Sequence, residues 1–386
     1  MLKRIFTFCL FFFFLAESHL GHTQPFPEAI NLNFSYLLSL SENPTQPLVH
    51  KSIESILNFV LHNQNSSFTL PQRANMTGAF YQFTLKSDLK KILAYGFNPQ
   101  LPSNILRPSS IRLAYWKKIS SSDGLELASL WSQVDRLSKP IIFSGVEYEE
   151  NTPDLFSGGY YGYDLDRVII LMPFAQTRVL ISISRQKNKS KVGQKGEIIG
   201  PDENWNYFYS EKPGLTKAGL GWVDSYIYKS ASIGIYIQTG PNKTKCAFFN
   251  WLKAGWMNIN FVQPEHILAG LKRFAQGVKT IIHSPNLPPV QNLIKFNKQI
   301  RQKTTAELRQ ELAAYFQQLA IISPCTSLLN SKDIQKEFTS GLYLQKINRH
   351  HLEALLNLEY LKLCLGKKTC LDLKAQLNTV SKTNLN

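Results

Sequence analysis

A helical repeat over residues 264–283 limits how this chain can fold. Apolar residues recur there at intervals of three and four and mark one continuous face over about five turns. Pro264 suits the first turn of a helix, and Ser284 with Pro285 ends the pattern. Such a helix carries one apolar stripe, which must be buried against another layer. The rest of the fold has to supply that layer.

Strand patterns fill the hundred or so residues before this helix. The clearest are Arg167–Met172 and Arg178–Arg185. In the second, Val179, Ile181 and Ile183 point to one side, and Leu180, Ser182 and Ser184 to the other. Further strands are predicted at residues 141–149, 157–164, 221–229 and 232–238, the last two as an antiparallel pair, and residues 247–256 suit a strand or a helix.

The order of elements from residue 78 predicts an α+β fold. A strand at 78–85, a helix at 87–95 capped by Ser87, a strand at 111–119 and an amphipathic helix at 123–137 precede the strand-rich part. We expect an antiparallel sheet packed on the long amphipathic helix, and a curved sheet that closes around the helix would satisfy the order. This order resembles the helix-grip arrangement of START and Bet v 1-like domains, which implies an apolar ligand between sheet and helix. An α+β fold with a filled core satisfies the same order.

Helical patterns follow Pro288 and Pro289. They cover residues 304–322 and 333–365, and Thr304 and Glu307 have the spacing of a capping box. We therefore divide the chain into an α+β domain at 25–285 and an α-helical C-terminal region at 290–380, with the boundary near residues 284–290.

The N-terminus has the layout of a secretory signal peptide. Lys3 and Arg4 precede an uncharged apolar run of 12 residues, Ile5–Ala16. A membrane-spanning helix needs roughly 20 such residues, so a cleaved signal at residues 1–18 is the favoured interpretation. It predicts an exported protein, periplasmic or secreted.

The formal net charge of +16 favours anionic partners. For an exported protein these are phospholipid headgroups and other envelope anions, and we expect no nucleic-acid partner. The densest basic run, residues 185–195, is interpreted as a solvated loop.

Four cysteines follow the signal: Cys246, Cys325, Cys364 and Cys370. In an exported protein they permit two disulfides in three possible pairings, and Cys364 with Cys370 is the local candidate. The cysteine spacing does not favour zinc or thiol-redox chemistry, and we expect neither a metal nor a cofactor.

Nucleophile and nucleotide motifs such as G-x-S-x-G are missing from the sequence. Carboxylates are the alternative catalytic candidates. Glu147 and Glu149 share one face of a predicted strand, and Asp164 and Asp166 flank Leu165. Paired carboxyls can cleave glycosidic bonds. The same alternation also marks the wet face of a strand.

Two glycine- and tyrosine-rich segments are candidate ligand-binding surfaces. The first is Gly158–Asp166, and the second is Asp202–Tyr209, within a predicted long loop at 191–222. Arg167, Arg178 and Lys217 could add contacts to an anion. The candidate ligand-binding residues are Tyr160, Tyr161, Tyr163, Arg167, Arg178, Trp205, Tyr207, Lys217 and Trp222. These residues also suit aromatic packing around a bend and solvation at strand ends.

Three functional hypotheses remain open from the sequence. The favoured one is an exported, non-enzymatic binding protein for an apolar or lipid-like ligand or for an anionic envelope surface. The first alternative is an envelope glycan hydrolase that uses the paired carboxylates. The second is an assembly factor that acts through its C-terminal helices. The ligand, the disulfide pairing and the oligomeric state stay open.

Overall fold

The computed structural model describes residues 26–371, apart from residues 123, 218–220, 323–331, 333–335 and 338–339. The predicted signal peptide and Cys325 lie outside the described residues. Among the described residues, no helix is both long and apolar enough to span a membrane.

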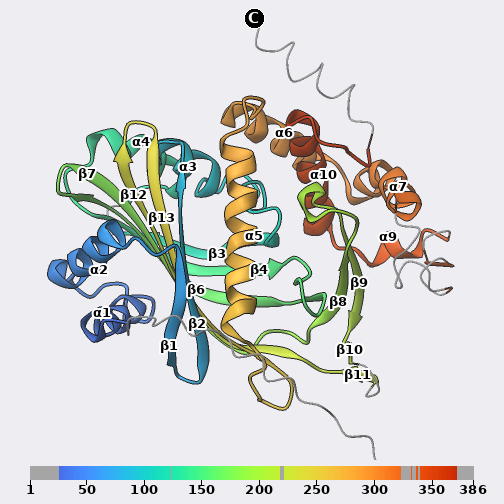
Figure 1. Cartoon of the computed structure of the whole chain (residues 1–386). Coiled ribbons are helices and arrows are strands. Elements are labelled where there is room, and N and C mark those ends of the chain that lie inside the picture. Colours follow the sequence, from blue (N-terminus) through green and yellow to red (C-terminus); the bar gives the residue numbers. More distant parts are fainter. Residues whose placement is uncertain are drawn as a thin grey trace, which may run out of the picture.

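The core of the fold is an eight-stranded antiparallel sheet that curves around a long helix (Figure 1). Its strands pair in the spatial order β1 (Ser67–Arg73), β2 (Met76–Leu85), β13 (Lys243–Gly255), β12 (Tyr226–Gly240), β7 (Thr177–Gln186), β6 (Gly162–Phe174), β4 (Ile141–Asn151) and β3 (Ile111–Ser121). The expected α+β fold, with an antiparallel sheet, a long helix and C-terminal helices, is confirmed.

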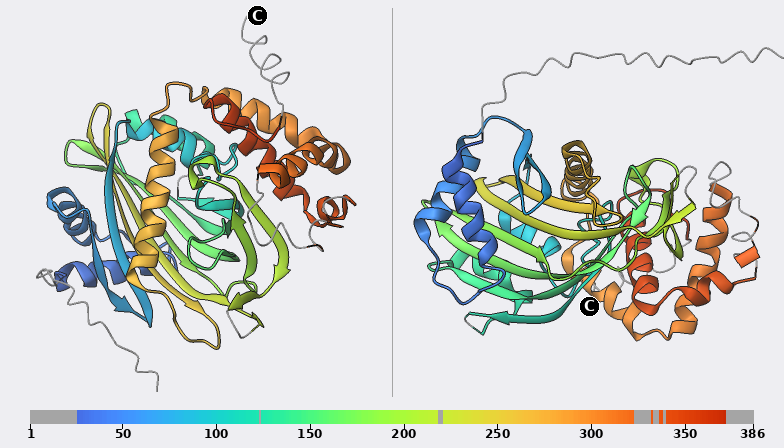
Figure 2. Two further views of the ribbon diagram at one scale, coloured as in Figure 1. Left: turned by 45° about the vertical axis from the view of Figure 1, so that its right-hand side comes forward. Right: turned by 90° about the horizontal axis from the view of Figure 1, so that it is seen from below.

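The strands bury apolar side chains on both faces of the sheet. On β7, Val179, Ile181 and Ile183 lie in one apolar cluster, whereas Leu180 lies in another, as the alternation predicted. The first cluster forms the convex face, which α1 (Glu28–Ser39) and α2 (His50–His62) cover. Figure 2 shows these two helices across the sheet from the long helix and the C-terminal helices.

The long helix α5 (Pro264–Ile282) packs on the concave face, mainly against β2 and β13. Its buried side chains include Ile267, Leu271 and Val278, at the spacing expected of an apolar stripe. Gln263 and His266 cap its first turn reciprocally, which satisfies backbone N–H groups that the helix leaves unpaired.

The C-terminal helices share the apolar core of the concave face. They are α6 (Val290–Gln302), α7 (Thr305–Ile322), α9 (Leu342–Lys346) and α10 (Arg349–Cys364). The predicted capping box is present: Thr304 Oγ1 accepts from Glu307 N, and Thr304 N donates to the Glu307 carboxylate. Within the described part of the helical pattern predicted over residues 333–365 lie α9 and α10, separated at Ile347–Asn348.

Several predicted elements are wrong in detail. Helix α3 (Leu89–Gly96) is capped by Asp88 rather than Ser87, because the Asp88 carboxylate accepts from Lys91 N. The helix expected at 123–137 is a short series of turns, Leu127–Ser129, α4 (Leu130–Gln133) and Val134–Arg136.

The hairpin expected from 221–229 and 232–238 is also wrong. Residues 226–240 form the single strand β12, in which Ser230 and Ala231 continue to pair with Leu252 and Trp251 of β13. A long continuous partner strand thus keeps this segment extended.

The loop expected at 191–222 is largely strand. β8 (Gln194–Ile198) and β9 (Tyr207–Pro213) form a small sheet with β5 (Gly159–Tyr160), and β10 (Leu215–Lys217) pairs with β11 (Gly221–Val223). Its glycine-rich composition indicated an irregular segment, but cross-strand pairs such as Gly196 with Tyr209 keep it extended.

We predict that the convex face carries much of the stability. Phe249 is fully buried there, and its ring centroid lies 4.5 Å from that of Phe34 and 4.7 Å from that of Phe80. Phe249→Ala should lower the free energy of unfolding by about 3–5 kcal/mol through the cavity it leaves. Leu32→Ala, at an exposed position of α1, should change it by less than about 0.5 kcal/mol. Urea denaturation measures both, and equal effects would contradict this assignment.

Candidate functional site

A cavity of about 1230 Å³ lies between the concave face of the sheet and α5. Drug-sized ligands occupy pockets of about 300–1,000 Å³, so this space can hold a larger molecule. Its apolar lining comes from the sheet, α5 and the segment after α3, and includes Phe83, Phe97, Leu101, Leu106, Leu113, Ile169, Tyr236, Phe248, Leu271 and Phe274. The helices α6 and α10 add Asn297, Ala354 and Asn357.

Small side chains on the central strands leave this space open. Ser182 and Ser184 of β7 and Ser232 and Gly234 of β12 line the cavity. The register places Ser184 opposite Ser232, and Ser182 opposite Gly234, so small residues face each other across the two strands. Large apolar residues at these positions would fill the concave face, as Leu180 does further along β7.

Four charged side chains form a cluster at the cavity wall, here called the charge quartet: Arg107, Glu147, Glu149 and Arg167. Arg167 Nη2 lies 2.9 Å from Glu149 Oε1, and Arg167 Nε also binds the Glu147 carboxylate. Arg107 Nη1 lies 3.0 Å from the same Glu149 oxygen. Ser182 Oγ accepts a further hydrogen bond from Arg167 Nη1 at 3.0 Å. Two positive and two negative groups thus compensate each other where water is scarce.

Burial and the neighbouring charges oppose each other at Glu147. Burial raises the pKa of this carboxyl above its usual range, while Arg167 and Arg107 lower it and Glu149 adds to the rise. The buried guanidinium of Arg167 loses hydration, but Glu147 and Glu149 outweigh that loss and raise the pKa of Arg167. The quartet thus depends on all of its members.

The carboxylates Asp164 and Asp166 lie on the other face of the sheet. They alternate with Leu165 and Arg167 on β6, and strand geometry turns them away from the cavity. Asp164 lies 2.6 Å from Lys117 Nζ, and Asp166 lies 3.2 Å from Lys187 Nζ. The structure therefore brings Glu147 and Glu149 together, but not these two aspartates with them.

The predicted ligand-binding residues divide into two groups. Tyr161, Tyr163 and Arg167 line the cavity. Tyr160 is buried outside it, and its hydroxyl accepts from Glu211 N. Three others also lie outside it. Tyr207 donates to Asp202, and the ring of Trp205 lies under Lys367 Nζ. Arg178 donates to the Val134 carbonyl. The side chains of Lys217 and Trp222 lie outside the described part of the chain.

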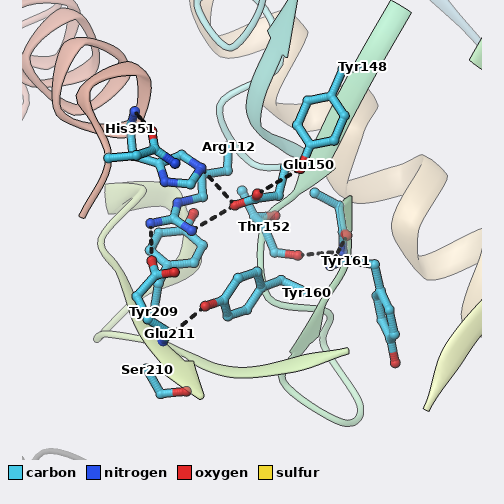
Figure 3. A network of polar contacts seen from close by, with 12 residues as sticks. Arg112, Tyr148, Glu150, Thr152, Tyr160, Tyr161, Tyr209, Ser210, Glu211 and His351 are labelled. Carbon is cyan, nitrogen blue, oxygen red and sulfur yellow. Dashed lines mark hydrogen bonds and ion pairs between the residues drawn. The ribbon is translucent and has the colours of Figure 1, made fainter. Parts of the chain in front are cut away.

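A second buried network joins the sheet to the C-terminal helices (Figure 3). Arg112 of β3 donates to Glu150 of β4 at 2.7 Å and to Glu211 of β9 at 2.6 Å. Its guanidinium carbon lies 3.8 Å from the ring centroid of Tyr209. His351 Nε2, at the start of α10, lies 3.1 Å from Glu150 Oε1 without the alignment of a hydrogen bond. This network fixes α10 beside the cavity.

The pKa values in this network show which protonation states it favours. Burial disfavours the Glu150 carboxylate, but Arg112 and His351 outweigh it and lower the pKa of Glu150 to about 2. Burial, together with Arg112, lowers the pKa of His351 despite the nearby Glu150. Folding therefore favours the ionised form of Glu150 and disfavours the protonated form of His351.

The main charged groups that sequence reasoning missed are Arg107 and Arg112. Arg107 comes from the irregular segment before β3, and Arg112 pairs with Glu211, which is 99 positions away in the chain. A further clamp joins Arg273 of α5 to Asp202 through two bonds of 2.6 and 2.7 Å. The local patterns gave no signal for these partners.

The candidate disulfide between Cys364 and Cys370 is not formed. Cys246, Cys364 and Cys370 are free thiols. Cys370 is held by a bond from its backbone N to the buried Glu359, which also pairs with Lys362 of α10. These polar contacts, rather than a disulfide, attach the segment after α10.

The likeness of this chain to known proteins is weak. No protein-family model matches the chain, and no curated protein matches it. Among solved structures it is similar to human StAR-related lipid transfer protein 5, at 8% sequence identity and a TM-score of 0.28, over 64% of this chain and 95% of that one.

We predict that the charge quartet is strongly coupled. Arg167→Met would leave two buried carboxylates with Arg107 alone and should lower the free energy of unfolding by about 3–5 kcal/mol. Adding Glu147→Leu removes the unpaired charge and should recover a clear part of that loss. A double-mutant cycle by urea denaturation measures this coupling. Simple addition of the two single losses would contradict it.

A second prediction concerns pH. His351 has its pKa lowered in the folded state, so protons bind the unfolded chain more readily below its ordinary value of 6.5, and stability falls as pH decreases. Glu150, with a folded pKa of about 2 against 4.5, adds a further loss between those values. In urea denaturation at pH 7 and pH 5, His351→Gln should flatten the decline between the two, whereas His50→Gln at an exposed site should not. An unchanged slope in His351→Gln would disprove this role.

Proposed function

We propose that this protein binds an apolar, lipid-like molecule in the cavity between its sheet and α5. The observation that carries the proposal is a space of about 1230 Å³ whose lining is mostly apolar and whose buried charge quartet is compensated internally. Transfer of a CH₂ group from water to such a lining is favourable by about 0.8 kcal/mol, so a long acyl or polycyclic ligand gains affinity with each buried group.

The quartet indicates which polar group the ligand carries. Its two arginines are already neutralised by Glu147 and Glu149, so a ligand with a net negative charge would meet both attraction and repulsion. An uncharged or zwitterionic polar end can instead exchange hydrogen bonds with the quartet and with Ser182 and Tyr163. We therefore propose a ligand with an apolar body and a polar end without net charge.

The structure favours binding over the two alternatives. Glu147 and Glu149 are engaged by guanidinium groups, so neither carboxylate is free to activate water, as the hydrolase hypothesis requires. The C-terminal helices α6 and α10 contribute to the cavity wall, so they already have a role within the molecule that needs no partner protein. Export also stays part of the proposal. It rests on the signal-like layout of residues 1–18.

A substitution that fills the cavity tests this proposal. Ser184 is buried and faces the cavity, so Ser184→Phe should occupy space that the ligand needs. We expect affinity for a fluorescent fatty-acyl probe to fall at least tenfold, with the fold retained by circular dichroism. Ser66→Phe makes the same change at an exposed site and should bind like the wild type.

Mass spectrometry of the protein purified gently from its own host gives an independent readout. A stoichiometric small molecule in the wild type that is missing from Ser184→Phe would support the proposal. Equal probe affinity in both variants would overturn it.

A further inference from the structure

Two ordered loops at one end of the cavity expose an unusual amount of apolar surface. Of the ten large hydrophobic side chains exposed in the described part of the chain, five lie in these loops: Leu155, Phe156, Met257, Ile259 and Phe261. The most exposed are Met257, at 76%, and Phe156, at 59%. Folded proteins in water seldom concentrate apolar surface in this way unless a partner covers it.

The two loops border the cavity together. The first connects β4 to β5, and the second connects β13 to α5. Leu155, Phe156 and Phe261 line the cavity, and they are exposed as well, so the cavity reaches the surface between them. The ring of Phe156 lies 4.2 Å, centroid to centroid, from that of His266 in the first turn of α5, which directly follows the second loop. We call this surface the apolar mouth.

Specific bonds hold both loops in shape. In the first, the Asp154 carboxylate accepts from Phe156 N at 2.7 Å and from Ser157 N at 2.6 Å. In the second, Asn260 Oδ1 accepts from Ala254 N and Val262 N, while Asn260 Nδ2 donates to Asn75 O and Thr77 Oγ1.

The tip of the second loop is also strained. Met257 and Asn258 have φ angles of 50° and 61°, a left-handed conformation that costs free energy outside glycine. The loop thus adopts a costly backbone conformation at its tip, where Met257 and Ile259 are exposed.

Positive charge lies directly beside these apolar side chains. Lys253 Nζ donates to Asn258 Oδ1 at 2.7 Å, and Lys195 Nζ donates to the Ser157 carbonyl at 2.8 Å. Lys229 pairs across the strands with Lys253. The acidic groups on these loops and the adjoining segments include Asp154, whose oxygens the loop backbone uses, Asp224 just before β12, and Glu265 at the start of α5. With the chain's net charge of +16, this arrangement suits a negatively charged surface.

We propose that the apolar mouth docks on an anionic lipid bilayer, with Met257, Ile259, Leu155 and Phe156 inserted among the acyl chains and the lysines at the headgroups. The choice of a bilayer rests in part on the proposed lipid binding, because an apolar ligand could then pass between membrane and cavity without crossing water. Insertion of apolar side chains, combined with attraction of lysines to anionic lipid, is the general basis of interfacial membrane binding.

Flotation of the full chain with vesicles, without added ligand, tests the docking separately from ligand binding. We expect binding to phosphatidylglycerol-containing phosphatidylcholine vesicles, and weaker binding to phosphatidylcholine alone or at high salt. Met257→Glu with Ile259→Glu should lower the partition constant by about a hundredfold, and Lys253→Gln by about fivefold. The matched control Leu32→Glu changes a residue that is 66% exposed on α1 and should bind like the wild type.

Three results would overturn the proposal. One is unchanged vesicle binding in the double variant, and another is an equal loss in Leu32→Glu. The third is a dimer of the wild type, seen by light scattering, that the double variant abolishes while neither binds vesicles, because a second copy would then cover the mouth. Retained affinity of the double variant for the fatty-acyl probe would show that docking, and not the cavity, was changed.

Discussion

The hollow between the sheet and α5 depends on small side chains at the centre of a concave sheet. Antiparallel strands alternate their side chains between two faces, and here the two faces of the same strands are filled differently. On the convex side, Ile181, Ile183, Ile233 and Ile235 pack tightly under α1 and α2. On the concave side, Ser182, Ser184 and Gly234 stand between them in sequence. The well-packed convex layer can support the fold while the concave layer stays open for a ligand.

Three polar networks join different elements around the cavity. The charge quartet ties β4 and β6 to the segment before β3, inside the cavity wall. The network of Arg112, Glu150, Glu211 and His351 ties β3, β4 and β9 to α10, and Arg273 with Asp202 ties α5 to the turn before β9. Each cluster is largely buried, so each costs desolvation that only complete pairing offsets. Interactions of this kind position elements more than they add stability.

The proposed function and the proposed docking surface together describe a route by which a ligand passes between a membrane and the cavity. The cavity supplies apolar volume with a compensated polar group, and the apolar mouth lies where this volume meets the surface. The cost of exposing Met257 and Ile259 in water is understandable if the exposed side chains spend part of their time in lipid. Part of the basic excess lies beside the mouth, in Lys195, Lys229 and Lys253.

Local periodicity was enough to predict helix 264–283, the two faces of Thr177–Gln186, and the placement of Glu147 and Glu149 on one side of a strand. These features depend on neighbours within a few residues, whose spacing the sequence displays directly. The same reasoning misjudged β12 as a hairpin and β8–β9 as a loop, because pairing with a distant strand overrode local glycine and serine. The cavity itself, the arginines that neutralise its carboxylates, and the meeting of two distant loops at its mouth follow from how the sheet curves and which far segments it brings into contact. Such contacts join residues tens of positions to over a hundred positions apart, as Arg107 with Glu149 and Phe156 with His266 do. Over such separations sequence spacing carries no geometric information, so only the folded chain could decide them.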